Sequence, residues 1–483
     1  MVDFSKYQPP GLYTEAVPGP QLSVQSATPT AVGIFGITVG FRQQVESLVV
    51  DPDTQNPDTT FSPAINRSLR QAGIRTDTIA VRNPNSGVAY VLNTDYTVFL
   101  VSGGQSSIST RDNLYTIQRV ISGGHILQGD TIEVSYNFTD DNYFTAQTFY
   151  DYDDVRDAYG TPFDASGNIQ SELSLAVNIA FTNGAQRVVC AAVDPVDKDN
   201  PTLSDYQAAL DTLKDVDDVS VVVPATGIQA IQSAVQAHVL QQSLNRYERR
   251  AILGRDGAGA AVSSAQLISD ANALTDSRIA LVSPATMKYF APELNKEIVI
   301  GGQFLAAAAA GISVAQLPSI PLTRKQVRGF TAVGVKEQQG QLNLESQNGL
   351  MVTELTRQGA LRIRHGVTTN AGDTLVREWN VIGQQDAMVY RLRAYLDNDQ
   401  LIGGIVDDLT LTNVKASADA ALQSLVTDRV VRGYADLKVR QLGTQPDVVE
   451  IRFAWQPSLP LNYIVVRYSV SISTGASTSL TSV

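Results

Sequence analysis

The sequence predicts a multidomain protein of the α/β plus β class. Its core is expected to be a doubly wound, mostly parallel central sheet, joined by a small all-β insert, a C-terminal α+β domain and extended arms at both ends. Three observations predict this. Short apolar runs alternate with helical patterns over 171–283, β-branched and aromatic runs separated by turn clusters fill 77–138, and two helical patterns precede alternating strands over 369–483. A length of 483 residues also favours two to four packed units.

The first 25 residues are expected to form an extended N-terminal arm, 1–25. Four prolines between positions 9 and 20 remove backbone donors and fix φ, so no helix can run through this segment. The segment also lacks the apolar run of a signal peptide. The residues expected to add to the edge of a sheet are Leu12, Tyr13, Leu22 and Val24.

The all-β insert is expected over 77–145. Runs rich in β-branched and aromatic residues predict strands at 78–81, 88–92, 96–101, 114–121 and 131–138. Turn-forming clusters, such as 83–87, separate these runs. In the last run, apolar residues alternate with polar ones from Thr131 to Phe138, which predicts one buried face and one wet face.

The α/β core domain is expected over 26–76 and 146–345. Apolar runs predict buried strands at 187–193, 220–223, 250–253 and 278–282. Helical patterns between or beside them predict helices at 202–214, 227–247 and 263–274. Repeated strand–helix–strand units require right-handed crossovers, and these predict a mostly parallel, doubly wound sheet.

An uncharged stretch, 298–317, is long enough to cross a bilayer. It is dominated by alanine, which is only weakly favourable in lipid, and no aromatic belt flanks it. We therefore predict a tightly packed buried helix and no membrane insertion.

The C-terminal α+β domain is expected over 346–462, with helices at 384–396 and 416–431 and a strand at 448–455. Residues 463–483 are expected to form a C-terminal strand and arm. Strict alternation places one set of side chains on a single face of that strand: Ile464, Val466, Tyr468, Val470 and Ile472.

The composition argues against several functions. There are 36 Lys and Arg residues against 48 Asp and Glu, a net charge of -12, which makes the chain a poor candidate for gripping nucleic acid. The single cysteine, Cys190, excludes an intrachain disulfide and an all-cysteine metal site, and is predicted to be a small core residue. Three histidines leave little material for histidine-based catalysis.

Standard catalytic and cofactor motifs are also missing from the sequence: there is no G-x-x-x-x-G-K-[ST], H-E-x-x-H or G-x-S-x-G. The segment 254–263 follows a predicted strand, but its glycine spacing is not that of a phosphate loop, and we predict a flexible loop. Acidic clusters at 51–58, 151–157 and 194–205 lack the glycine and the terminal Glu of a calcium loop, so solvated loops are predicted. Neither an enzyme nor a cofactor or metal site is expected.

Read in order, several segments resemble the sheath proteins of contractile phage tails and related injection machines. In the N-terminal half these segments are PPGLYTEAVPGP (9–20), TPTAVGIFG (28–36), NPNSGVAYVLNTDYTV (83–98), YQAALDTLKDVDDVSVVVPATG (206–227) and RRAILGRDG (249–257). In the C-terminal half they are QNGLMVTELTRQGALRIRHGVTT (347–369), REWNVIGQQDAMVYRLRAYLD (377–397) and QPDVVEIRFAWQPSLPLNYIVVRYSVSIS (445–473). The similarity runs over nearly the whole chain.

The resemblance implies a structural subunit that polymerises as stacked hexameric rings around a tail tube and contracts to drive the tube through the host envelope. It implies a virion location after assembly in the host cytoplasm, with no enzymatic activity and no cofactor. The implied partners are other copies, the tail tube protein, and baseplate and tail terminator proteins, but not nucleic acid or membranes.

The resemblance also implies positions for the parts. The β insert is expected to protrude outward, and the C-terminal domain to face the tail tube. The arms are expected to pair with neighbouring subunits by strand addition. The expected tube contact is the helix 416–431 and its surroundings, with Lys415, Asp419, Asp428 and Arg429.

Two alternatives from other classes stay open. One is an oligomeric binding or surface-layer protein built from the same modules, and the other is a serine hydrolase using the parallel sheet. A Ser–His–Asp triad assembles in space, so sequence spacing alone does not exclude it.

Overall fold

The computed structural model describes residues 29–38, 42–50, 69–71, 73–74, 76–102, 114–138, 141–164, 166–193, 200–397, 401–468, 470–471 and 477–478. The predicted N-terminal arm, with Leu12, Tyr13, Leu22 and Val24, lies outside these residues, and so does Ile472. Two compact units are present: residues 385–457 form the smaller, and 29–384 with the residues from 458 onward form the larger.

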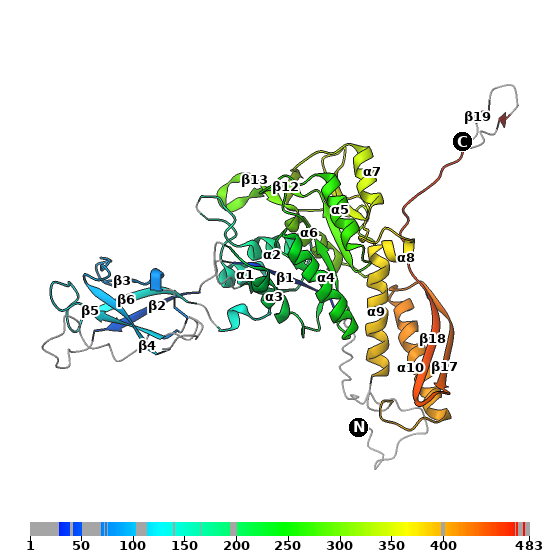
Figure 1. Cartoon of the computed structure of the whole chain (residues 1–483), viewed down its shortest axis with the longest axis horizontal. Coiled ribbons are helices and arrows are strands. Elements are labelled where there is room, and N and C mark those ends of the chain that lie inside the picture. Colours follow the sequence, from blue (N-terminus) through cyan, green and yellow to red (C-terminus); the bar gives the residue numbers. More distant parts are fainter. Residues whose placement is uncertain are drawn as a thin grey trace, which may run out of the picture. The chain divides into compact units, whose positions relative to one another are not determined.

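The larger unit is built on an eight-stranded sheet with the order β16–β15–β11–β10–β9–β1–β8–β7. Figure 1 shows β1 of this sheet among the helices of the larger unit. The inner strands, from β15 to β8, are all parallel, and only the two edge strands are antiparallel. The mostly parallel sheet is therefore confirmed. Its strands are β1 (Ala31–Ile37), β7 (Gln147–Phe149), β8 (Val188–Val193), β9 (Val219–Pro224), β10 (Arg250–Leu253), β11 (Ile279–Ser283), β15 (Leu350–Leu355) and β16 (Leu361–Ile363).

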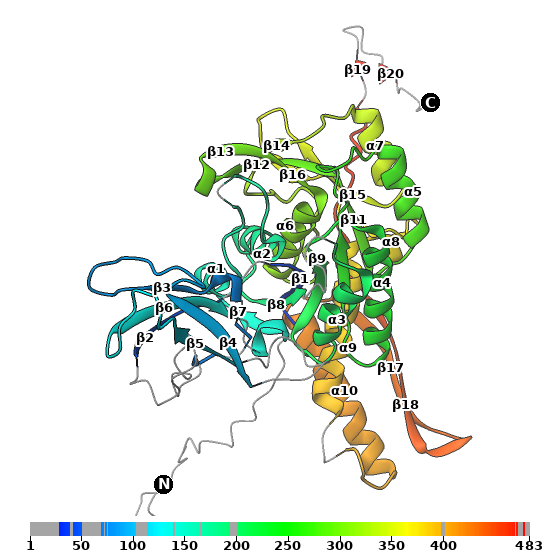
Figure 2. The ribbon, with the colours of Figure 1, turned by 60° about the vertical axis from the view of Figure 1, so that its left-hand side comes forward.

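Helices cover both faces of this sheet (Figure 2). Successive residues of β1 point to opposite faces, so Ile34 packs with α2 and α6 in one hydrophobic cluster, and Phe35 packs with α3, α4 and α5 in another. Because both faces are covered, the strands are continuously apolar. The helices are α2 (Glu172–Thr182), α3 (Leu203–Thr212), α4 (Gln229–Leu244), α5 (Ser264–Leu274) and α6 (Gly302–Val314).

The uncharged stretch at 298–317 divides between two elements. Its first residues belong to β13 (Lys296–Gly301), and α6 follows, buried from Gly302 to Ile312, which confirms the prediction of a buried helix. Among the described residues, no helix combines the length and the apolar character needed to cross a membrane. In β8, Cys190 is fully buried, and this burial raises the pKa of its thiol.

Smaller elements complete the core. A three-stranded antiparallel sheet has the order β13–β12–β14, with β12 (Thr286–Ala291) between β13 and β14 (Phe330–Val333). Three short helices are α1 (Tyr152–Tyr159), α7 (Gln339–Gln347) and α8 (Thr374–Arg377), and the 3-10 turns are Thr76–Thr78, Asp141–Phe144 and Pro292–Leu294.

The β insert has its own core, and its boundary differs from the prediction. The strand β2 (Arg42–Val49) pairs antiparallel with β6 (Thr131–Phe138) along its whole length, and Val50, Leu69 and Ile74 share the insert's hydrophobic cluster. The assignment of 26–76 to the core is therefore wrong for 42–50 and 69–74. The remaining strands of the insert are β3 (Ala80–Arg82), β4 (Tyr96–Ser102) and β5 (Leu114–Arg119), whereas 88–92 makes only isolated bridges.

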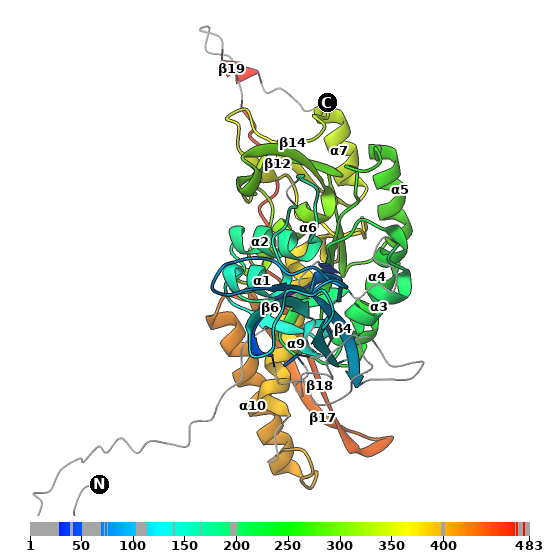
Figure 3. The same cartoon turned by 90° about the vertical axis from the view of Figure 1, so that its left-hand side faces the viewer.

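In the smaller unit, α9 and α10 pack with the hairpin β17–β18 (Figure 3). Leu422 and Leu425 of α10 form its core with Ala387 of α9, and Trp455 of β18 packs against them. The prediction of 346–462 as one domain is wrong at both ends, because β15 and β16 pair into the central sheet and Ser458 onward belongs to the larger unit. The elements are α9 (Trp379–Leu396), α10 (Asp408–Thr427), β17 (Gly433–Leu442) and β18 (Gln445–Gln456).

The predicted helix 416–431 begins earlier and ends earlier than expected. The side chain of Asp407 caps α10 by accepting a hydrogen bond from the backbone N–H of Thr410 at 2.7 Å. At the other end, Arg429 has a φ of +59°, which ends the helix before it.

Candidate functional site

The carboxyl edge of the parallel sheet, where ligands usually bind in such folds, is occupied by main chain. A Cβ on Gly254 would lie 2.1 Å from the carbonyl oxygen of Gly302, and one on Gly227 would lie 2.1 Å from the backbone nitrogen of Asp256. The backbone N–H of Gly302 donates to the carbonyl oxygens of Arg255 and Ala285, each at 2.8 Å. The prediction of a flexible loop at 254–263 is therefore wrong for its first residues, where glycines permit close packing.

The three histidines lie in separate networks. The Nδ1 of His125 lies 2.6 Å from Asp95 Oδ1, and the Nε2 of His365 lies 3.0 Å from Glu378 Oε1. Burial and the neighbouring charge of Arg249 lower the pKa of His238 to about 4. Within the described ranges, no serine hydroxyl is hydrogen-bonded to any of them, and no three His, Cys, Asp or Glu side chains could hold a metal ion. The hydrolase alternative has no supporting geometry there.

The chain is anchored to α9 immediately after the smaller unit. The backbone N–H of Ser458 donates to Gln384 Oε1 at 2.7 Å, and its carbonyl oxygen accepts from Gln384 Nε2 at 3.0 Å and Asn380 Nδ2 at 2.9 Å. Asn380 and Gln384 lie one turn apart, and both are buried. Ser458 is thus held through both of its main-chain polar groups.

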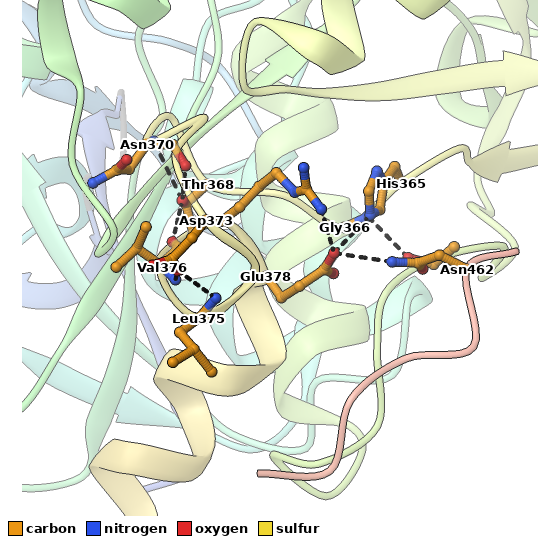
Figure 4. A network of polar contacts seen from close by, with 11 residues as sticks. His365, Gly366, Thr368, Asn370, Asp373, Leu375, Val376, Glu378 and Asn462 are labelled. Atoms are coloured by element: carbon orange, nitrogen blue, oxygen red, sulfur yellow. Dashed lines mark hydrogen bonds and ion pairs between the residues drawn. The ribbon is translucent and has the colours of Figure 1, made fainter.

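A second anchor follows at Asn462. Its Nδ2 donates to Glu378 Oε1 at 3.0 Å, and the same oxygen lies 3.0 Å from His365 Nε2 (Figure 4). The side chain of Glu378 is completely buried. Two points four residues apart therefore fix where the C-terminal segment leaves the larger unit.

Beyond this double anchor, the chain is apolar and exposed. Residues 457–468 have no regular secondary structure, and among the described residues further on β19 (Val470–Ser471) pairs with β20 (Ser477–Thr478). The predicted strand at 463–473 is therefore not formed over 463–468 within one chain, since no neighbouring strand supplies hydrogen bonds. The most exposed side chains, between 73% and 79% exposed, are Leu461, Tyr463, Ile464, Val465, Val466 and Tyr468.

The residues expected to contact a tube lie on or just after α10. Lys415 and Asp419 are exposed and one turn apart, and Asp419 Oδ1 accepts a hydrogen bond from the Tyr434 hydroxyl at 2.7 Å. That bond raises the pKa of Tyr434. Asp428 forms an ion pair with Arg391 at 3.0 Å. The four residues therefore do not form one cluster.

A polar cavity of about 420 Å³ lies beside the double anchor, and sequence reasoning did not predict it. Arg362 contacts Glu354 Oε1 through Nε at 2.8 Å and Nη2 at 2.6 Å, and Arg364 contacts the other carboxylate oxygen. Burial disfavours the charge of Glu354, but these hydrogen bonds outweigh it and lower its pKa. The cavity is also lined by Arg324, Arg377, Ser346, Asn462 and Tyr463. Arg362 on β16 and Arg364 just after it are the local sequence signal of the cavity.

Comparison with known proteins gives one close relative. The chain is 44% identical to the tail sheath protein of Mycobacterium phage Bxz1, over 99% of this chain and 98% of that protein. No protein-family model matches the sequence.

Solved structures show the same fold at low identity. A chain of the anti-feeding prophage baseplate has a TM-score of 0.54 at 14% identity, covering 69% of this chain and 90% of that one. A chain of the contracted anti-feeding prophage helical sheath has a TM-score of 0.53 at 14% identity, again covering 69% of this chain and 90% of that one. A chain of the contracted sheath complex of the extracellular contractile injection system PVC has a TM-score of 0.52 at 14% identity, covering 69% of this chain and 88% of that one.

We expect Gly254→Ala to destabilise the larger unit by about 1–3 kcal/mol or more, because the new methyl group meets main chain that cannot move aside. Chemical denaturation followed by circular dichroism measures this. The matched control is Gly259→Ala, whose Cβ would meet nothing nearer than 3.9 Å and which should change stability by less than about 0.5 kcal/mol. Equal stabilities for the two variants would contradict the close packing.

We expect Gln384→Ala to loosen the first anchor, because it removes both side-chain hydrogen bonds from Gln384 to Ser458 and leaves the main chain of Ser458 partly unpaired. The loss should be about 1–3 kcal/mol locally. Amide hydrogen exchange at Ser458 should then accelerate, with no such change for Gln385→Ala, whose side chain is exposed one position away. Unchanged exchange in Gln384→Ala would show that the anchor is held by other contacts.

Proposed function

This chain belongs to the tail sheath protein family, and from that premise we propose that it polymerises through its arms into stacked hexameric rings around a tail tube and contracts to drive the tube through the host envelope. As a sheath protein it is a structural component of the virion tail. Its partners are other copies and the baseplate, and we extend the proposal to the tail tube and terminator proteins.

The exposed C-terminal arm carries this proposal. A run of large apolar side chains that are more than 70% exposed is unusual for a soluble monomer, and such surfaces mark interaction sites. The segment also presents unpaired backbone groups in an alternating sequence, with Ile464, Val466 and Tyr468 as one set. Strand addition to a neighbouring subunit would pair the backbone groups and bury the apolar side chains, since main-chain hydrogen bonds hold an added strand and pockets take its alternate side chains.

The strength of such a contact suits a lattice that must rearrange. An added strand of about five residues makes roughly four hydrogen bonds, each contributing about 0.5–1.5 kcal/mol net. One arm therefore contributes only a few kcal/mol. Repetition of this contact along the lattice makes the assembly stable. During contraction each subunit moves as a rigid body while its arm stays hydrogen-bonded to the neighbour.

The finer architecture belongs to the same proposal. The core is doubly wound, the residues of the smaller unit form the C-terminal α+β domain that faces the tube, and the β insert protrudes outward. The arms at 1–25 and 463–483 join neighbouring subunits. Lys415 and Asp419, exposed together on α10, are the best placed of the four expected tube contacts.

We expect Val466→Pro to abolish polymerisation while the monomer stays folded, because proline removes a backbone donor that strand addition needs. Negative-stain electron microscopy of purified protein shows the result: long hollow tubes from the unchanged chain and none from the variant. Val466→Ala keeps the backbone donor and should still form tubes. Tubes from Val466→Pro would contradict the role of this strand, and a binding or surface-layer protein would become the better explanation.

For the tube contact, we expect Lys415→Glu to weaken binding of the sheath to purified tail tubes without preventing sheath polymerisation. Reversing one charge of an interface pair typically costs more than 1 kcal/mol, roughly a tenfold loss of affinity. Co-sedimentation with tail tubes measures it. Gln423→Glu, exposed on the same helix, is the control. An unchanged affinity for Lys415→Glu would remove α10 from the contact.

A further inference from the structure

The polar cavity beside the double anchor carries an excess of positive charge in a chain whose net charge is -12. Four arginines line it: Arg324, Arg362, Arg364 and Arg377. Two carboxylates oppose them, because Glu354 lies in the lining and Glu378 directly behind Arg377, at 3.8 Å from its Nη2. Four guanidinium groups against two carboxylates leave an excess of two positive charges.

The excess charge is not spread evenly. The guanidinium groups of Arg362 and Arg364 are both paired with Glu354. Arg362 donates to its Oε1 and Arg364 to its Oε2, in the geometry of strong charge-assisted pairs. Arg324 is exposed and Arg377 only loosely paired. These two guanidinium groups are thus the ones available to an incoming anion.

Buried donors in the same cavity lack partners. Arg377 Nε and Ser346 Oγ are both inaccessible to solvent and make no hydrogen bond with any described residue. A buried donor without a partner costs roughly 1–3 kcal/mol, and an acceptor that reaches it recovers that cost. An oxyanion supplies such acceptors once the groups that cover the two atoms move aside.

We propose that this cavity receives a carboxylate from an acidic side chain of a second copy of this chain. The proposal rests on the function proposed above and extends it to a second contact between subunits. Asn462 and Tyr463, which line the cavity, are also the first residues of the C-terminal arm, so an incoming subunit that takes the arm passes this opening. A guanidinium fork matches a carboxylate in geometry as well as in charge.

The arm itself is not the source of that carboxylate side chain, because residues 463–483 contain no Asp and no Glu. An acidic side chain elsewhere on the neighbour therefore has to reach the cavity. The two contacts have different roles. Main-chain pairing of the arm depends little on its sequence, whereas a charged pair beside the start of the arm fixes the register in which the arm pairs with the neighbour.

Carbodiimide coupling in assembled tubes tests the proposal. The variant Arg324→Lys keeps the charge and places a primary amine at the cavity, which the reagent joins to a carboxylate in direct contact. Tubes are grown from an equal mixture of ¹⁴N and ¹⁵N chains of this variant, coupled, digested and analysed by mass spectrometry. Arg357→Lys, exposed on the turn between β15 and β16 and outside the cavity, is the matched control.

The expected result is a mixed-isotope cross-link from position 324 to an Asp or Glu, at least tenfold above position 357 and lost when the tubes are dissolved before coupling. Cross-links confined to a single isotope, or equal cross-link yields at positions 324 and 357, would overturn the proposal. Intact tubes in the same experiment would still support the proposed sheath function. Failure of the unchanged chain to form tubes, seen first by electron microscopy, would overturn the proposed function and this contact with it.

A second measurement guards against an effect on folding. Arg324→Glu should raise the concentration needed for tube formation about tenfold, and Arg324→Lys should restore it to within about threefold of the unchanged chain. The unfolding midpoints of all three should agree, because the side chain of Arg324 is exposed. Equal polymerisation of Arg324→Glu and the unchanged chain would also overturn the proposal.

Discussion

The rest of this molecule depends on one exposed apolar segment, residues 463–468, which pairs with no described strand of its own chain. In the assembly proposed above, a neighbouring subunit would bury its apolar side chains. The anchors at Ser458 and Asn462 make this productive, because a strand that leaves from a fixed point reaches its partner with less loss of entropy than a free tail.

The central sheet explains how the anchors can be fixed. Asn380 and Gln384 hold Ser458 only because α9 begins in the larger unit, where Trp379 is buried and its carbonyl oxygen accepts from Arg250 of β10 at 3.0 Å. The carboxyl edge of this sheet, where ligands usually bind in open parallel sheets, is filled because Gly254 lets the chain after β10 contact the start of α6. The architecture thus serves here as a rigid body, and a shared fold does not carry a shared chemistry.

Local patterns predicted the interior well and the boundaries poorly. The prediction at 250–253 matches β10 to the residue, because Ala251, Ile252 and Leu253 supply the apolar side chains that a strand covered on both faces needs. In β2, RQQVESLV, polar residues hide the alternation, and the pairing with β6 depends on residues far along the chain. The alternation at 463–473 indicated a strand, but 463–468 form none within this chain, because strand formation also requires a pairing partner that a local pattern does not specify. The cavity was missed because Arg324, Arg362 and Arg377 meet only after β15 and β16 have joined the central sheet.

The single cysteine has a practical meaning for following contraction. Cys190 lies fully buried in β8, and burial keeps its thiol protonated, whereas the thiolate is the reactive form. The natural chain is therefore silent toward thiol reagents while it stays folded. A cysteine placed on the exposed arm or on α10 would be the one labelled position in every subunit, so fluorescent probes could report the movement of each part without a cysteine-free background having to be made first.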